Sequence, residues 1–330
     1  MVASNDVDRA TALRQRGNSF LVQGNGRGAK KAFLAARALV GDDDPLAAGQ
    51  IASGLGRALH LLGDTDAAID ELESALALLV GHLGELHAEV ALCANNLGLA
   101  WVDEDLWNAA AAMQYAKAIG DHVYAADAPQ QATTLSNLAY MCSEAGQPAT
   151  AIAYSERALA MQERTLSPWH LDVALTLSNL AHYHRELGQG DERALSLALQ
   201  LATVVPELVK TDDETAASIA FSTGTLVLEL AHDPSRAAGL YETALAMRVR
   251  LRNPVKTIVN TVRNASARLF VAGATEVAIA FLERVEVRGA TMRTALPAQL
   301  AAVRAGDRDA VLEGTELEPD DEDEDDSDHD

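Results

Sequence analysis

The sequence predicts an all-α protein: about seven antiparallel helix pairs stacked into a right-handed superhelical solenoid, followed by a disordered acidic C-terminal tail. One phrase occurs twice, because ATTLSNLAYMCSEAGQ at Ala132–Gln147 returns 42 residues later as ALTLSNLAHYHRELGQ at Ala174–Gln189. The residues are 48% apolar but only 4% aromatic, a composition that suits closely packed helices better than a sheet. Both observations favour a repeated helical unit.

A steady period is the third observation. The residues that would turn each first helix into its second fall at spacings of 39, 42, 41, 42, 44 and 41. Such a period is typical of a solenoid. Gly and Asp tolerate the left-handed backbone that ends many helices, so we expect inter-helix turns at these marks. The marks are Gly24, Gly63, Asp105, Gly146, Gly188, His232 and Gly273.

The repeat array is expected over residues 1–290, with the polar first repeat, about residues 7–46, as its cap. In the second helices, alanines seven residues apart would let neighbouring helices approach closely. The alanine pairs are Ala68 and Ala75, Ala151 and Ala158, and Ala237 and Ala244.

Residues 291–312 are expected to form a short capping helix over the other end of the array.

The acidic tail covers residues 313–330. It holds 12 acidic residues and no Lys or Arg, which leaves −10 of the formal net charge of −22 for the first 312 residues. A segment of this composition cannot bury enough apolar surface to fold. We expect it to aid solubility. The alternative is a pseudo-ligand that folds back onto the array, where Arg57, Arg185 or Arg263 could receive it.

Charge and the N-terminal sequence restrict the partners and the compartment. The net negative charge argues against nucleic acid or an anionic membrane as the main partner. The chain starts without the apolar core of a signal peptide and has no apolar run near the ~20 residues that span a bilayer. Cys93 and Cys142 show no disulfide or metal-ligand pattern. A cytoplasmic protein with reduced thiols is therefore expected.

Three phrases carry a resemblance to a known family. LGELHAEVALCANNLGLA at Leu83–Ala100 and LSPWHLDVALTLSNLAHY at Leu166–Tyr183 resemble a linker and first helix, and AAGLYETALAM at Ala237–Met247 resembles a second helix. The chain is similar to tetratricopeptide repeat (TPR) proteins, and among them to the kinesin light chains with repeats of ~42 residues. The resemblance covers roughly residues 7–290. It implies a protein–protein interaction scaffold with a concave groove.

An asparagine ladder is the main candidate site. One Asn stands nine residues before the turn mark in each of four repeats. The resemblance implies that these side chains line the groove and hydrogen-bond the backbone of an extended peptide. An amide offers a donor and an acceptor, so it can hold a peptide unit of any sequence. The alternative is that the amides bridge neighbouring helices. The ladder consists of Asn96, Asn137, Asn179 and Asn264.

Neighbouring side chains extend this candidate face. Ser136, Ser178 and Arg263 precede the ladder by one residue, and Tyr140 and His182 follow it by three. All of them are expected on the ladder side of their helices, where aromatic and amphipathic groups can anchor a ligand. Ordinary packing between repeats is the alternative.

A column of acids predicts the charge of the ligand. Asp103, Glu144 and Glu186 recur at spacings of 41 and 42 residues. Stacked repeats would bring these carboxylates together, and a basic peptide would relieve their repulsion. Alternatively, they are solvated acids at helix C-termini.

No cofactor, metal or catalytic site is expected. In HYHRE at His182–Glu186, His182 and Glu186 share a helix face, but no third ligand is evident. GNGRG at Gly24–Gly28 has neither a preceding strand nor the Lys-Ser/Thr end of a phosphate-binding loop. The sequence therefore favours a non-enzymatic adaptor that binds a peptide segment of a protein partner. The alternative is a regulatory receptor for a small signalling peptide or metabolite that acts on a separate effector.

Overall fold

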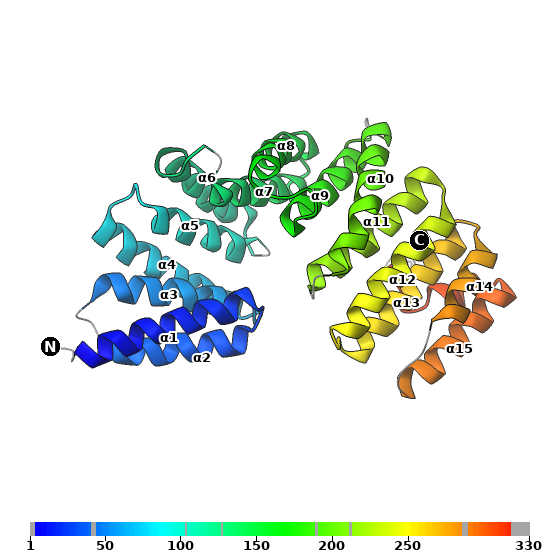
Figure 1. Ribbon diagram of the computed structural model, residues 1–330, viewed down its shortest axis with the longest axis horizontal. Coiled ribbons are helices and arrows are strands. Elements are labelled where there is room, and N and C mark those ends of the chain that lie inside the picture. The colour runs from blue at the N-terminus through cyan, green and yellow to red at the C-terminus, as the bar shows by residue number, and fades with distance from the viewer. Residues whose placement is uncertain are drawn as a thin grey trace, which may run out of the picture. The chain divides into compact units, whose positions relative to one another are not determined.

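The computed structural model describes residues 4–40, 44–102, 104–126, 128–188, 191–210, 213–285 and 290–317. These residues form 16 helices with their connecting turns and contain no strand (Figure 1). The chain divides into two compact units, Met1–Thr165 and Leu166–Asp330.

The first unit contains four helix pairs. In each pair the two helices pack on each other, and the second helix then packs on the first helix of the next pair. First helices of neighbouring pairs also touch. The pairs are α1 (Ser4–Val22) with α2 (Gly26–Val40), α3 (Pro45–His60) with α4 (Thr65–Leu83), α5 (Ala88–Trp101) with α6 (Leu106–Val123), and α7 (Pro129–Glu144) with α8 (Pro148–Thr165).

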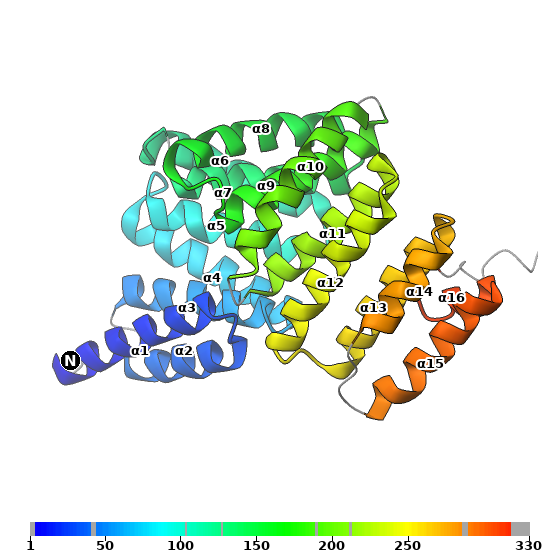
Figure 2. The same ribbon diagram turned by 45° about the vertical axis from the view of Figure 1, so that its right-hand side comes forward.

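The second unit continues the pattern with three pairs and ends in two further helices (Figure 2). The predicted all-α repeat of seven helix pairs is therefore confirmed. The pairs are α9 (Leu171–Leu187) with α10 (Asp191–Leu208), α11 (Glu214–Ala231) with α12 (Pro234–Arg250), and α13 (Val255–Val271) with α14 (Thr275–Arg284); α15 (Ala290–Ala305) and α16 (Arg308–Leu312) follow.

Six of the seven turn marks have the left-handed backbone that the sequence predicts, with φ between 50° at His232 and 77° at Gly273. The prediction is wrong at Asp105, where φ is −152°. Asp105 is instead the N-cap residue of α6, where its Oδ1 accepts the N–H groups of Trp107 and Asn108. Asp64 and Asp233 hold the same place one residue after the turn in their own repeats.

Small residues set the distance between helices, as expected. The six alanines of the predicted pairs are fully buried. Glycines allow still closer contacts: a Cβ on Gly54 would lie 2.4 Å from the Phe33 ring, and one on Gly224 would lie 2.9 Å from Tyr241. Phe33 and Tyr241 are among the largest fully buried side chains of their units. Repeat geometry and core packing thus depend on the same positions.

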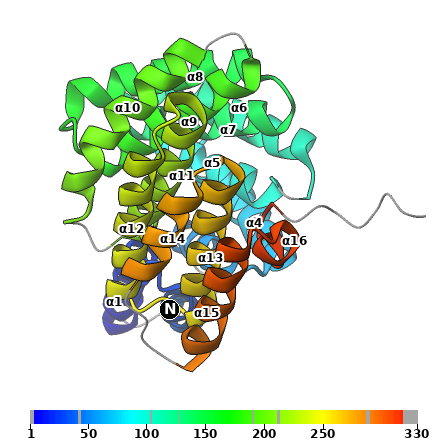
Figure 3. The same cartoon turned by 90° about the vertical axis from the view of Figure 1, so that its right-hand side faces the viewer.

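Two helices follow the last pair where the sequence predicts one. Gly306, with φ 70°, separates α15 from α16, and Asp307 caps α16 through the N–H of Ala310. Both helices pack on α13 (Figure 3), and their apolar side chains join its core cluster. The first five residues of the predicted tail, 313–317, continue along this surface, whereas residues 318–330 lie outside the described part of the chain.

Both cysteines are free thiols. Cys93 is fully buried on α5, and this burial raises the pKa of its thiol to about 11 despite a hydrogen bond to Ser53. Cys142 is half-buried, and burial raises its pKa as well. Both environments disfavour the reactive thiolate.

Candidate peptide-binding face

The ladder residues lie on the first helices of their pairs: Asn96 on α5, Asn137 on α7, Asn179 on α9 and Asn264 on α13. The first two belong to the first unit and the last two to the second. We call the side of the first helices that carries these residues and their neighbours the first-helix face of each unit.

In the first unit, the ladder contains a helix-to-helix bridge. The Asn137 amide nitrogen donates to the Asn95 side-chain oxygen at 3.1 Å, which joins α7 to α5. Asn95 is 5% exposed and Asn96 is 8% exposed. The Nδ2 of Asn96 is buried without a hydrogen-bond partner among the described residues, as is the Oγ of Ser136. Asn137 therefore bridges helices, which is the alternative that the sequence leaves open.

Asn95 is not among the site residues that the sequence predicts. It stands one residue before the ladder, in the place that Ser136, Ser178 and Arg263 hold in their repeats. That equivalence was the available signal. Beyond the bridge, Tyr140 is 41% exposed and Glu144 is exposed, so both side chains on α7 are accessible to a ligand.

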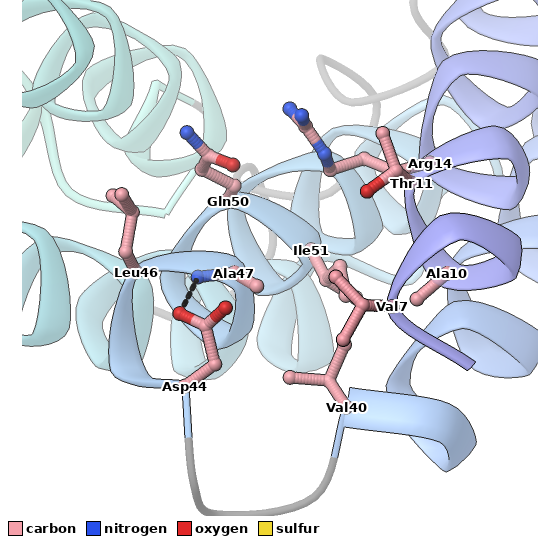
Figure 4. A pocket seen from close by; sticks show the side chains of 10 residues that line it. All are labelled: Val7, Ala10, Thr11, Arg14, Val40, Asp44, Leu46, Ala47, Gln50 and Ile51. Carbon is pink, nitrogen blue, oxygen red and sulfur yellow. Dashed lines mark hydrogen bonds between the residues drawn. The ribbon is translucent and has the colours of Figure 1, made fainter. Parts of the chain in front are cut away.

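A cavity of about 430 Å³ opens between α1 and α3. Figure 4 shows Val7, Val40 and Ile51 side by side in it, with the polar ends of Arg14 and Gln50 above them. Gln50 is held in place because its amide donates to both carboxylate oxygens of Glu89 at 2.8 Å. The cavity has the size of a ligand pocket and combines an apolar wall with a few polar groups.

In the second unit, hydroxyl groups take the place of the amide bridge. The Oγ atoms of Ser178 on α9 and Ser222 on α11 lie 3.2 Å apart in a hydrogen bond. Ser178 is buried, and Asn179 beside it is half-buried. Here the two residues that link neighbouring first helices both stand ten residues before their turn marks.

Charged side chains cross the rest of this face. Arg185 on α9 pairs with Glu229 on α11 at 2.5 Å, and Glu229 also lies 3.8 Å from Arg268 on α13. His182 lies next to this network. Burial, with a further contribution from the Arg185 and Arg268 cations, lowers the pKa of its imidazole although Glu186 and Glu229 oppose the shift. His182 is therefore held in its neutral form.

The last ladder residue holds a stretch of backbone. The side-chain oxygen of Asn264, itself buried, accepts the backbone N–H of Glu316 at 3.0 Å. The carboxylate of Glu316 pairs with Arg268 at 3.1 Å. Arg263, next to Asn264, lies beside Gly314, where a Cβ would come within 3.0 Å of its guanidinium.

The predicted acidic column is divided by the structure. Asp103 lies outside the described residues, Glu144 belongs to the first unit and Glu186 to the second. Glu144 and Glu186 are both exposed near the ends of their helices. Their role in binding a basic ligand remains a prediction.

Among the described residues, no group of three or more His, Cys, Asp or Glu side chains is placed to hold a metal ion. None of the helices in those residues is both long enough and apolar enough to cross a bilayer.

Comparison with known proteins supports the repeat assignment. Residues 130–200 match the tetratricopeptide repeat family model. A comparison with curated protein sequences finds no match. A kinesin light chain TPR-like repeat protein of Podosopora anserina superposes with a TM-score of 0.50 at 19% identity, covering 62% of this chain and 98% of its own.

Two other solved structures cover more of the chain. The apo form of RapI has a TM-score of 0.59 at 13% identity, over 90% of this chain and 98% of its own. NprR, a quorum sensor of B. thuringiensis, in complex with its cognate peptide NprX has a TM-score of 0.55 at 13% identity, over 84% and 73%. At these identities the likeness establishes the fold. The predicted resemblance to TPR proteins with kinesin-light-chain-type repeats is thus confirmed.

Proposed function

We propose that this protein is a non-enzymatic scaffold or adaptor whose first-helix faces bind an extended peptide segment of a protein partner. The observation that carries the proposal is the hydrogen bond from the Glu316 backbone N–H to the Asn264 side chain at 3.0 Å. A ladder amide here binds the main chain of a segment outside its own helix pair. This is the interaction that the ladder would offer to a ligand.

The chemistry of the ladder fits backbone recognition. Side-chain amides bind a peptide group without regard to sequence, and each hydrogen bond contributes only ~0.5–1.5 kcal/mol. Several repeats must therefore act together on one extended ligand. Affinity would come from the amides and specificity from their neighbours, such as the exposed Tyr140.

The charge of the ligand is a finer part of the proposal. In the first unit the carboxylate of Glu144 is exposed, and we propose that it contacts a basic residue of the peptide. We place the protein in the cytoplasm, since its two free thiols fit a reducing compartment.

A second candidate function is a regulatory receptor for a small signalling peptide or metabolite. The cavity of about 430 Å³ between α1 and α3 favours it, because its apolar wall suits one side chain of a short ligand. The fold shared with NprR, which binds the peptide NprX, points in the same direction.

Peptide selection followed by ladder substitution tests the proposal. A library of random peptides is selected on the immobilised full chain, and affinities are measured by calorimetry. Replacing both Asn137 and Asn179 by Ala should weaken the selected peptides by roughly 1–3 kcal/mol, from one or two hydrogen bonds per Asn. Gln130→Ala removes an exposed amide from the same helix as Asn137 and should change nothing.

The melting temperature separates binding from folding. Loss of the Asn137–Asn95 bridge should cost only ~0.5–1.5 kcal/mol of stability, so the double variant should stay folded. Failure to select any peptide, or a double variant that binds as tightly as the unmodified chain, would reject the adaptor. Peptides that compete only through the cavity between α1 and α3 would favour the receptor.

A further inference from the structure

The segment after α16 leaves the helix in a defined turn. Gly314 has φ 66°, and the hydroxyl of Thr315 donates to the Leu312 carbonyl at 2.7 Å. The N–H of Leu317 in turn donates to the Thr315 hydroxyl at 3.2 Å. Within this turn, the backbone N–H of Glu316 points toward α13.

Three groups of α13 receive the segment. Asn264 accepts the Glu316 N–H, and Arg268 pairs with the Glu316 carboxylate. Arg263 lies close to Gly314, because a Cβ on Gly314 would come within 3.0 Å of its guanidinium. One amide and two cations on a single helix thus contact the backbone, the acid and the small residue of Gly314–Leu317.

The electrostatics of this face require an acid at the place of Glu316. Arg268 has a side chain only 19% exposed, and its other carboxylate contact is Glu229 at 3.8 Å, which already pairs with Arg185. Without Glu316, the two cations Arg263 and Arg268 would have, among the described residues, only the carboxylate of Glu229 beside them, and that carboxylate already pairs with Arg185. Glu316 completes a series of alternating charges, Arg185–Glu229–Arg268–Glu316.

The segment also has an apolar anchor. Leu317, directly after the acid, packs on the core cluster formed by α11–α16. Glu316 itself is 63% exposed, so the contact is open to solvent and can be exchanged. The segment thus presents a small residue, an acid and an apolar residue to this surface.

We propose that this face of α13 is a binding site for a short peptide carrying an acidic residue followed by an apolar one, and that Gly314–Leu317 occupies it in cis. This rests on the proposed function and adds the chemistry of one ligand. A partner peptide must displace the chain's own segment. Its apparent affinity is therefore reduced in proportion to the occupancy of the site by that segment.

A fluorescein-labelled peptide with the sequence of residues 313–319, EGTELEP, is the probe, and its binding to full-length protein is followed by anisotropy. Glu316→Lys repels Arg268 and frees the site. It should bind the probe about 3- to 10-fold more tightly than the unmodified chain, if the segment occupies the site about 70–90% of the time. Glu313→Lys makes the same charge change at an exposed neighbour and should match the unmodified chain.

A charge exchange checks the pairing. The double variant Arg268→Glu with Glu316→Lys restores the attraction between α13 and the chain's own segment. It should bind the original probe more weakly than Glu316→Lys alone does. It should bind instead a second probe in which Glu316 is replaced by Lys. Hydrogen exchange supplies a readout that needs no added peptide. Asn264→Ala should speed exchange of the Glu316 amide without speeding exchange within α13.

The proposal would be overturned if the probe bound the unmodified chain and Glu316→Lys equally tightly, or if it did not bind Glu316→Lys at all. Residues 314–317 would then be only a structural cap. This result is distinct from failure of the adaptor. Selected peptides that depend on Asn137 and Asn179 would retain the proposed function while this inference falls.

Discussion

The two units use the same helix pair but present different chemistry on their first-helix faces. In the first unit two side-chain amides form the Asn95–Asn137 bridge, and the cavity between α1 and α3 has one apolar wall. In the second unit the face carries alternating charges from Arg185 to Arg268, and a segment of the chain lies on it. One backbone repeat thus carries two kinds of first-helix face.

The difference is possible because separate positions control packing and chemistry. One leucine stands eight residues before the turn in several repeats of both units. It is buried and holds the two helices of its pair together, as Leu55, Leu138 and Leu180 do. The residue ten before the turn is free to vary, from Asn95 and Ser136 to Ser178 and Arg263. We therefore expect changes at the second kind of position to alter the chemistry of the face without altering the fold.

The largest expected effect comes from a packing position. Gly54→Ala would place a Cβ 2.4 Å from the Phe33 ring, which must leave its place between α1 and α3. Such overpacking costs typically 1–3 kcal/mol, and we expect ~3 kcal/mol because the ring is fully buried. Urea unfolding gives the cost, and hydrogen exchange should rise in α1–α4 but not in α11–α14.

Gly81→Ala is the matched control. This glycine lies in α4 with nothing within 4 Å of its would-be Cβ, so the change should stabilise by ~0.5–1 kcal/mol through helix propensity. Equal stability of the two variants would show that the close contact with Phe33 does not hold the first unit together. Raised exchange in α11–α14 as well would mean that the units unfold as one.

The fold could be predicted because packing positions recur at a fixed period. The turns at Gly146, Gly188 and Gly273 could be predicted from the repeat spacing together with the residue type, because only a few residue types tolerate φ near 70°. The prediction was wrong at Asp105 because the N-cap residue of α6 stands where the repeat period places a turn residue. Periodicity reports the length of a repeat, and a helix cap can stand where a turn residue is expected.

The site was less predictable, because contacts between distant segments leave no periodic signal. Asn264 was identified from its ladder position, but its partner Glu316 lies 52 residues away. The sequence suggested Arg57, Arg185 or Arg263 as receivers of the tail. The structure pairs Glu316 with Arg268, a cation outside the compared columns, and pairs Arg185 with Glu229.

A smaller effect is expected from the charge network of the second unit. Glu229→Gln would leave Arg185 and Arg268 without the carboxylate between them. Because these side chains are partly exposed, the cost should be only ~0.5–1 kcal/mol. Urea unfolding at low and high salt measures it, and salt should shrink the difference between the variant and the unmodified chain. Glu73→Gln, an exposed carboxylate of the first unit, should show no such dependence. A difference that persists unchanged at 1 M salt would mean that Glu229 acts by packing.

The smallest effect concerns the pH dependence of the second unit. Burial is the main cause that lowers the pKa of His182, so the folded chain holds this imidazole neutral where the unfolded chain, with a pKa near 6.5, begins to bind a proton. The unfolded state binds more protons in that window, and stability must fall as the pH drops through 6.5 toward the lowered folded pKa. Below the folded pKa the imidazole is charged in both states, and its contribution to stability stays lost.

His182→Gln removes the titration, so urea unfolding at pH 7.5 and 5.5 should show a smaller loss of stability on acidification than in the unmodified chain. His82→Gln, an exposed histidine of α4, should leave the original loss in place. If His182→Gln lost as much stability between these pH values as the unmodified chain, the neutral imidazole beside Arg185 and Arg268 would not contribute to the fold.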